Sequence, residues 1–150
     1  GFPRSARAET PLHVIAAPGC GCCHAWADLA RARGYAVTVS EFTDPDREKV
    51  ALGIPAHLAS CHTVRAGGYL VEGHVPFEAL EALLRDRPSI GGLAVPGMPH
   101  GSPGMGDDSA ARYDVIAFGG VAGAGRLFYE VGGEWLFENI VKWLEDVEAP

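Results

Sequence analysis

The stretch that decides the fold is Pro18-Gly19-Cys20-Gly21-Cys22-Cys23-His24, which holds three of the four cysteines of the 150-residue chain. A short apolar run, residues 12–17, leads into it. A segment with apolar residues at helical spacing, residues 25–33, leads out of it. The pattern predicts a buried strand, a tight turn that carries cysteines, and the N-terminus of a helix.

The segments after this turn continue an alternation of strands and helices. Residues 35–42 alternate and are β-branched, which predicts a second strand, parallel to the first and joined to it by a right-handed crossover. Asp44 and Pro45 open a short helix that ends near Gly53. The further predicted elements are a β-hairpin of residues 60–64 and 69–75, a helix between Pro76 and Pro88, a strand over residues 113–118 with a hairpin partner over residues 126–131, and a terminal amphipathic helix with Leu136, Ile140, Trp143, Leu144 and Val147 on one face.

This order of elements predicts an α/β protein with a thioredoxin-like βαβ-ββα domain over residues 11–118. Residues 1–10 lack periodicity and are expected to be a flexible lead. Within them, Ala6-Arg7-Ala8 has the form of a signal-peptidase site, so an exported protein is expected. Residues 91–106, rich in glycine and proline, are expected to lack regular structure. Residues 119–150 are expected to form a C-terminal extension that packs on the domain or on a partner.

The composition argues against two classes of partner. The net charge of −7 does not suit nucleic acid or an anionic membrane surface. No apolar run approaches the roughly 20 residues that a membrane-spanning helix needs. The four cysteines are too few for a disulfide-dense scaffold, and their clustering suits a site better.

The cysteine turn suits either a redox pair or a metal site. Cys20 and Cys23 form a C-x-x-C pair at a predicted helix N-terminus, where the dipole and the free N–H groups favour thiolates. Cys22 and Cys23 are adjacent, which does not suit closed zinc sites, whose paired cysteines are spaced by two to four residues. Crowded thiolates suit a multinuclear cluster instead. Soft Cu(I) is the metal that they favour, with zinc and iron–sulfur as competitors.

The fourth cysteine, Cys61, is predicted to complete a site with four thiolates. In a thioredoxin-like domain, the loop before the third strand faces the C-x-x-C turn, and Cys61 begins that strand. The alternative is a cysteine buried in the sheet. Met98 and Met105 are candidate soft ligands or a lid over the cluster, and the alternative is that they anchor an irregular loop to the core.

The histidines are weaker candidates. His24 lies in the first predicted helical turn and could reach the edge of the site. Strand alternation turns His62 away if Cys61 faces the site, unless the strand has not yet begun. For both, and for His74 at the end of a strand, we favour a hydrogen-bonded or solvated histidine over a ligand.

Four separated motifs resemble those of the CopG-like copper-binding family, formerly a domain of unknown function. They are Cys20-Gly-Cys-Cys23 followed by Trp26, Ser60-Cys61-His62-Thr63, Glu72-Gly73-His74-Val75-Pro76, and the glycine, proline and methionine loop of residues 92–105. The resemblance covers residues 11–118. It implies a thioredoxin-like fold, a periplasmic location, a role in copper resistance with redox interconversion of Cu(I) and Cu(II), and a copper–thiolate cluster on Cys20, Cys22, Cys23 and Cys61.

Three functions remain open at this point. The first is a copper-binding protein with a polynuclear Cu(I)–thiolate cluster, whose partners are copper ions and a periplasmic copper-handling or electron-transfer protein. Whether such a protein is an enzyme, a copper oxidoreductase, is left open. The second is a thiol–disulfide oxidoreductase, in which Cys20 attacks and Cys23 resolves the mixed disulfide. The third is a structural zinc domain, which the crowded cysteine spacing suits least.

Overall fold

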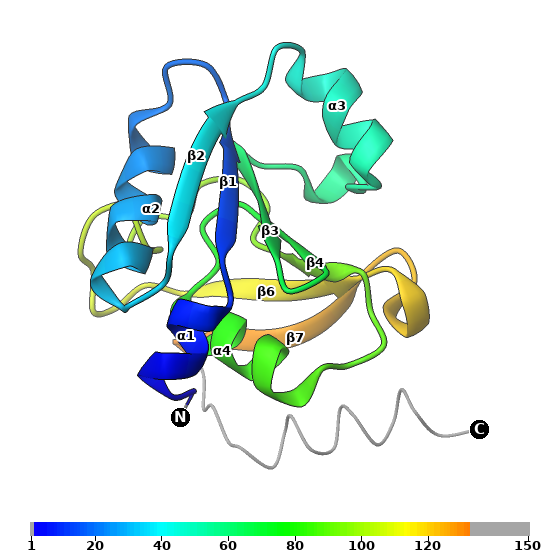
Figure 1. Cartoon of the computed structure of the whole chain (residues 1–150). Coiled ribbons are helices and arrows are strands. Elements are labelled where there is room, and N and C mark those ends of the chain that lie inside the picture. The colour runs from blue at the N-terminus through cyan, green and yellow to red at the C-terminus, as the bar shows by residue number, and fades with distance from the viewer. Residues whose placement is uncertain (1, 133–150) are drawn as a thin grey trace.

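The computed structural model describes residues 2–132, and these form an α/β fold around one seven-stranded sheet (Figure 1). The helices are α1 (Arg4–Glu9), α2 (Gly21–Ala32), α3 (Pro45–Leu52) and α4 (Phe77–Asp86), with short 3-10 helices η1 (Ala56–Leu58) and η2 (Gly120–Ala122). The strands are β1 (Leu12–Ala16), β2 (Val37–Glu41), β3 (His62–Ala66), β4 (Tyr69–Glu72), β5 (Gly92–Ala94), β6 (Tyr113–Phe118) and β7 (Arg126–Val131).

In the sheet, the strands follow the order β2-β1-β3-β4-β5-β6-β7. β1 is parallel to β2, and β4 is parallel to β5. The other neighbouring strands are antiparallel. The parallel pair β1–β2 and the hairpin β3–β4 are the pairings that the sequence predicts, and the α/β class is confirmed.

The two faces of the sheet are covered by different elements. The larger apolar cluster contains Trp26 of α2 and Leu80 of α4, both fully buried. A smaller cluster contains Leu58, which lies in η1 after α3. The neighbours Leu93 and Ala94 on β5 belong to the larger and the smaller cluster respectively, as the alternation of side chains along a strand requires. α2 and α4 therefore cover one face, and the α3–η1 segment covers the other.

Local signals set the ends of α3 as predicted. The Asp44 side chain accepts a hydrogen bond from the backbone N–H of Arg47 at the start of the helix. Gly53 ends the helix with a left-handed backbone, φ 92°. These are contacts between near neighbours in the chain, which is why the sequence alone reveals them.

Regular structure occurs in two segments where none was predicted. Residues 4–9, part of the lead that we expected to be flexible, form α1. There the Arg7 guanidinium donates to the carbonyl of Arg33 at 2.9 Å and lies 3.8 Å from the Glu81 carboxylate. Residues 92–94, expected to be irregular, form β5 between β4 and β6. Contacts with distant residues fix the first segment, so the local sequence does not reveal it. The second segment is a buried strand of three residues, which is too short to show the alternation of a strand.

The C-terminal part of the described chain extends the same sheet. β6 and β7 form the predicted hairpin, with an irregular register between Val115 and Ile116. The predicted terminal helix lies outside the described residues. The thioredoxin-like assignment and a domain boundary at residue 119 stay predictions. Among the described helices, none has the length and apolar character that crossing a membrane requires.

Candidate metal centre

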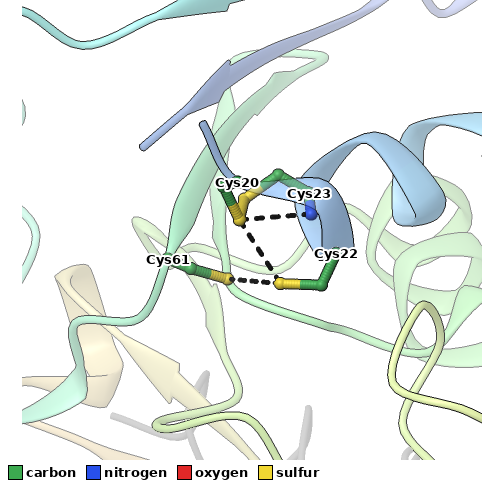
Figure 2. A group of neighbouring side chains, drawn as sticks. All are labelled: Cys20, Cys22, Cys23 and Cys61. Carbon is green, nitrogen blue, oxygen red and sulfur yellow. Dashed lines mark hydrogen bonds between the residues drawn. A yellow bond between two sulfur atoms is a disulfide. The ribbon is translucent and has the colours of Figure 1, made fainter. Parts of the chain in front are cut away.

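Four cysteine sulfurs converge where β1 leads into α2 (Figure 2). The Sγ atoms of Cys20, Cys22, Cys23 and Cys61 all lie within 4.8 Å of one another. Cys22 Sγ is 3.3 Å from Cys20 Sγ and 3.9 Å from Cys61 Sγ, although Cys22 and Cys61 are 39 positions apart in the chain. The fold thus brings together the four cysteines that the sequence predicts to share a site.

Backbone contacts set the position of the turn beside Cys61. Cys20 is the N-cap of α2, and its Sγ accepts a hydrogen bond from the backbone N–H of Cys23 at 3.3 Å. The backbone N–H of Ala17 donates to the carbonyl of Cys61 at 3.0 Å, which continues the pairing of β1 with β3 beyond the strand ends. The N-terminus of α2 therefore points its free N–H groups towards the sulfurs.

Two of the four sulfurs are bonded to each other. Cys20 and Cys23 form a disulfide, whereas Cys22 and Cys61 are free and half-buried (Figure 2). A disulfide sulfur cannot act as a thiolate ligand, so the disulfide and a site with four thiolates are alternative states of the same residues. The turn can form the redox pair that its C-x-x-C spacing suggests.

The environment of Cys61 keeps its thiol protonated. Burial raises the pKa of Cys61 to about 11, and the neighbouring Cys22 sulfur contributes to the increase. At neutral pH, Cys61 is therefore a thiol in the metal-free chain. Binding of a metal at this sulfur must release its proton.

A buried carboxylate fixes the backbone around Cys61. Glu72, at the end of β4, is fully buried and accepts hydrogen bonds from the Ser60 backbone N–H at 2.8 Å and the Thr63 hydroxyl at 2.5 Å. The ammonium of Lys49, on α3, pairs with the same carboxylate and donates to the Ser60 carbonyl at 2.5 Å. Because a buried charge is costly without partners, these contacts hold residues 60–63 in one arrangement.

Two buried histidines face the sulfur of Cys61. His74 Nε2 lies 3.1 Å from that sulfur, and His62 Nδ1 lies 3.4 Å from it. Both side chains are fully buried. Burial lowers the pKa of His62 to about 3 and also lowers the pKa of His74, so both imidazoles are neutral at physiological pH. Cys61, His62 and His74 form a second group whose donor atoms lie within 4.8 Å of one another.

The sequence did not lead us to select His74, and for His62 the exception to the alternation argument applies. β3 begins at His62, so Cys61 precedes the strand and the two neighbours are not forced to opposite faces. The antiparallel register that pairs Thr63 with Glu72 continues to place Cys61 opposite His74. The predicted hairpin could have identified His74, because the register of its strands is enough to place His74 opposite Cys61.

Trp26 connects α2 to the hairpin side of the site. Its indole N–H donates to the carbonyl of Val75 at 3.0 Å. Its ring centroid is 5.0 Å from that of Phe77 and 5.5 Å from that of His62. The tryptophan that follows the cysteine turn in the sequence motif therefore orients the turn helix against the segment between β4 and α4.

The methionine loop, residues 95–106, lies against the site and is attached to it at two points. The Ser60 hydroxyl donates to the carbonyl of Gly97 at 2.5 Å. His74 Nδ1 donates to the carbonyl of Pro103 at 2.6 Å. Gly104, with φ +90°, approaches α2 so closely that a Cβ would lie 2.9 Å from a carbonyl oxygen of that helix. The loop thus closes one side of the site with its backbone.

The weaker ligand candidates differ in position. Met98 is 54% exposed, and its sulfur lies 4.0 Å from Cys22 Sγ, at the solvent edge of the site. Within residues 2–132, no hydrogen bond joins the Met105 side chain to a cysteine, and its backbone N–H donates to the carbonyl of Ser102. His24 is exposed and belongs to neither group of donor atoms.

The donor atoms suit a soft metal ion. The first group consists of sulfur alone, and the second adds two neutral imidazoles to the shared sulfur of Cys61. Neither group contains a carboxylate in the part of the chain that the structure describes. Thiolate and thioether sulfur favour Cu(I), and imidazole is also a common copper ligand, so these residues fit copper.

The fold and the site define an α/β protein with a cysteine-rich candidate metal centre, and comparison with known proteins gives its family. The family described as "Protein of unknown function, DUF411" matches residues 58–105. Two solved structures, "Copper resistance protein copG- Form 1" and "Copper resistance protein copG- Form 2", are each 37% identical to this chain. The chain belongs to this CopG-like DUF411 family, as the sequence motifs predict.

The likeness to the two CopG structures extends over most of both chains. Form 1 aligns with 82% of this chain and 98% of its own, with a TM-score of 0.74. Form 2 aligns with 81% of this chain and 97% of its own, with a TM-score of 0.73. No curated protein sequence matches the chain.

Proposed function

We propose that this chain is a copper-binding protein that holds a polynuclear Cu(I)–thiolate cluster on Cys20, Cys22, Cys23 and Cys61. The observation that carries the proposal is the convergence of four sulfurs, from two distant segments, within 4.8 Å. Adjacent cysteines are poorly suited to one tetrahedral ion but well suited to bridging several soft ions. The two similar structures carry the name of a copper resistance protein, which supports copper as the metal.

Each part of the site has a role in this function. The N-terminus of α2 stabilises the negative charge of the turn thiolates. The disulfide between Cys20 and Cys23 must be reduced before these sulfurs can bind copper. Cys61 loses its proton on binding, so copper uptake releases protons and stabilises the folded chain. Met98 covers the solvent edge of the cluster with a soft thioether sulfur.

We further propose that the chain acts in the periplasm, in copper resistance, and that its bound copper changes oxidation state. In that step Cu(I) gives one electron to an electron-transfer partner and becomes Cu(II). The supporting observation is the second donor group, Cys61, His62 and His74, which combines sulfur with imidazole nitrogen. Sulfur alone favours Cu(I), whereas a set that includes imidazole is less restricted to that oxidation state.

A second candidate function is thiol–disulfide exchange, and the disulfide between Cys20 and Cys23 favours it. In this reaction the Cys20 thiolate attacks a substrate disulfide and forms a mixed disulfide. Cys23 then attacks Cys20, which releases the reduced substrate and leaves the Cys20–Cys23 disulfide. This function gives no role to Cys22 or to Cys61, although both lie within reach of the pair.

Metal and thiol analysis separates the two functions. Protein is purified without oxygen from copper-supplemented cells, and copper per chain and free thiols are measured on the same sample. Several copper ions per chain, with all four thiols blocked, support the cluster. No copper, with two thiols lost to a disulfide that a reductant restores, supports the oxidoreductase and contradicts the cluster.

A further inference from the structure

We propose that residues 133–150 dock in an open groove beside the metal centre and brace the methionine loop that closes one side of it. The groove is lined by described residues of α2, the start of α4, the methionine loop and the β6–β7 hairpin. The docking itself does not depend on metal binding. Its effect on copper release rests on the proposed function.

The groove exposes apolar surface that belongs to the main core. It has a volume of about 700 Å³, and its lining includes Phe77, Tyr113, Tyr129 and Val131. All four pack in the larger apolar cluster, but only Phe77 is buried, whereas the other three stay partly exposed. Leu29 of α2, which also lines the groove, is 43% exposed. An apolar face of a sheet is stabilised when another element covers it, so the groove suits an apolar occupant.

The charges at the groove do not favour a charged partner. Of the four charged residues that line it, three are already in ion pairs. The Arg33 guanidinium lies 3.5 Å from the Glu78 carboxylate, and the Asp28 carboxylate lies 3.0 Å from the guanidinium of Arg31. Asp107 is the fourth. Exposed pairs of this kind contribute little free energy, so apolar contact decides what docks.

The segment that we propose as the occupant starts at the groove. Val131 lines the groove, and Gly132 is the last described residue. Leu136 follows Val131 by five positions, a stretch that spans at most about 18 Å, so it can reach the groove. The segment carries apolar side chains at helical spacing, which suits packing on an apolar surface: Leu136, Ile140, Trp143, Leu144 and Val147.

The groove shares residues with the metal centre through the methionine loop. Pro103 and Gly104 of this loop line the groove. The carbonyl of Pro103 accepts the hydrogen bond from His74 Nδ1, and a Cβ on Gly104 would lie 2.9 Å from the carbonyl oxygen of Cys22. A segment seated in the groove therefore contacts the same residues that hold the loop against the site. We expect its docking to slow the release of copper.

The most direct test is nuclear Overhauser spectroscopy on the full chain, reduced and free of metal. We expect contacts from the methyl groups of Leu136 and Ile140 to the rings of Phe77, Tyr113 and Tyr129. An isotope-filtered spectrum of labelled and unlabelled chains mixed together shows whether these contacts arise within one chain or between two. Contacts within one chain support the proposal. Their absence, or contacts only between chains, would overturn it.

A matched pair of variants tests the effect on the metal centre. Ile140→Glu places a charge on the apolar stripe, and Lys142→Glu places the same residue beside it, off the stripe. We expect Ile140→Glu to increase several-fold both the hydrogen exchange of the Gly101 and Met105 amides and the rate at which a Cu(I) chelator removes copper. Lys142→Glu should match the wild type. Thermal unfolding of each variant controls for loss of the fold.

The outcomes separate the docking from the function on which its effect rests. Contacts within one chain, with copper release equally fast in Ile140→Glu and the wild type, would leave the docking standing and overturn the bracing of the loop. A wild-type chain that binds no copper would overturn the proposed function, and the Overhauser contacts would still decide the docking.

Discussion

The two sides of the metal centre, the cysteine turn and the β3–β4 hairpin, are built in different ways. The turn presents three sulfurs from four consecutive positions, fixed by the N-terminus of one helix. The hairpin presents a single sulfur, Cys61, surrounded by two buried histidines and held by the Glu72–Lys49 pair. The difference shows that local sequence can specify most of the ligands, whereas the geometry of the site depends on long-range contacts.

The largest expected effect, a loss of bound copper, follows from removing the sulfur of the hairpin side. In Cys61→Ser, the hard hydroxyl oxygen replaces the only thiolate that joins the turn to the hairpin. We expect the variant to lose most of its copper, measured by elemental analysis of protein prepared without oxygen. Thermal unfolding of the metal-free variant controls for loss of the fold, and an unchanged copper content would contradict the assignment of Cys61.

The buried Glu72–Lys49 pair, which holds the backbone around Cys61, is tested by removing one of its two charges. Glu72→Gln leaves the ammonium of Lys49 buried without its counter-charge, so we expect the free energy of unfolding of the metal-free chain to fall by about 3–5 kcal/mol. Asp28→Asn, which removes an exposed ion pair with Arg31, should cost about 1 kcal/mol or less.

Urea unfolding of both variants makes this comparison, and a double variant sharpens it. Adding Lys49→Met to Glu72→Gln removes the unpaired charge and should restore part of the lost stability. Equal effects of Glu72→Gln and Asp28→Asn would contradict the structural role of the buried pair.

The buried imidazole of His62 makes the hairpin side sensitive to acid. Burial lowers its pKa from the ordinary value of 6.5 to about 3, so between these values the unfolded chain binds more protons than the folded one. The stability that this neutral histidine contributes is therefore complete above about pH 6.5 and is lost as the pH falls towards 3. The free energy of urea unfolding, measured at pH 7 and pH 5 on metal-free protein, should fall more in the wild type than in His62→Gln. The same decrease in both proteins would argue against His62 as its source.

The smallest expected effect lies at the solvent edge, where Met98 approaches the turn. Met98→Leu keeps the apolar volume but removes the thioether sulfur that lies 4.0 Å from Cys22 Sγ. We expect an unchanged number of copper ions and a modest increase in the rate at which a Cu(I) chelator removes them. Met105→Leu is the matched control in the same loop and should leave that rate unaltered. If both variants release copper as slowly as the wild type, Met98 does not shield the cluster.

What the sequence predicts and what it misses follow the same division between local and long-range contacts. The N-terminus of α2 at the cysteine turn, the caps of α3 and the β3–β4 hairpin depend on neighbours in the chain, and all were predicted. β5 was missed, because three residues buried between two strands carry no periodic signal. His74 was not selected as a ligand, because its approach to Cys61 depends on the register in which β3 pairs with β4 and not on its neighbours in the chain.

Copper K-edge X-ray absorption on anaerobic, copper-loaded protein is the sharpest test of the proposed cluster, because it reports the atoms around each copper. For a polynuclear cluster we expect a first shell dominated by sulfur and a second shell of neighbouring copper, since bridging thiolates hold the ions close together. Isolated copper without a copper neighbour, or a shell of nitrogen and oxygen only, would contradict the polynuclear thiolate cluster.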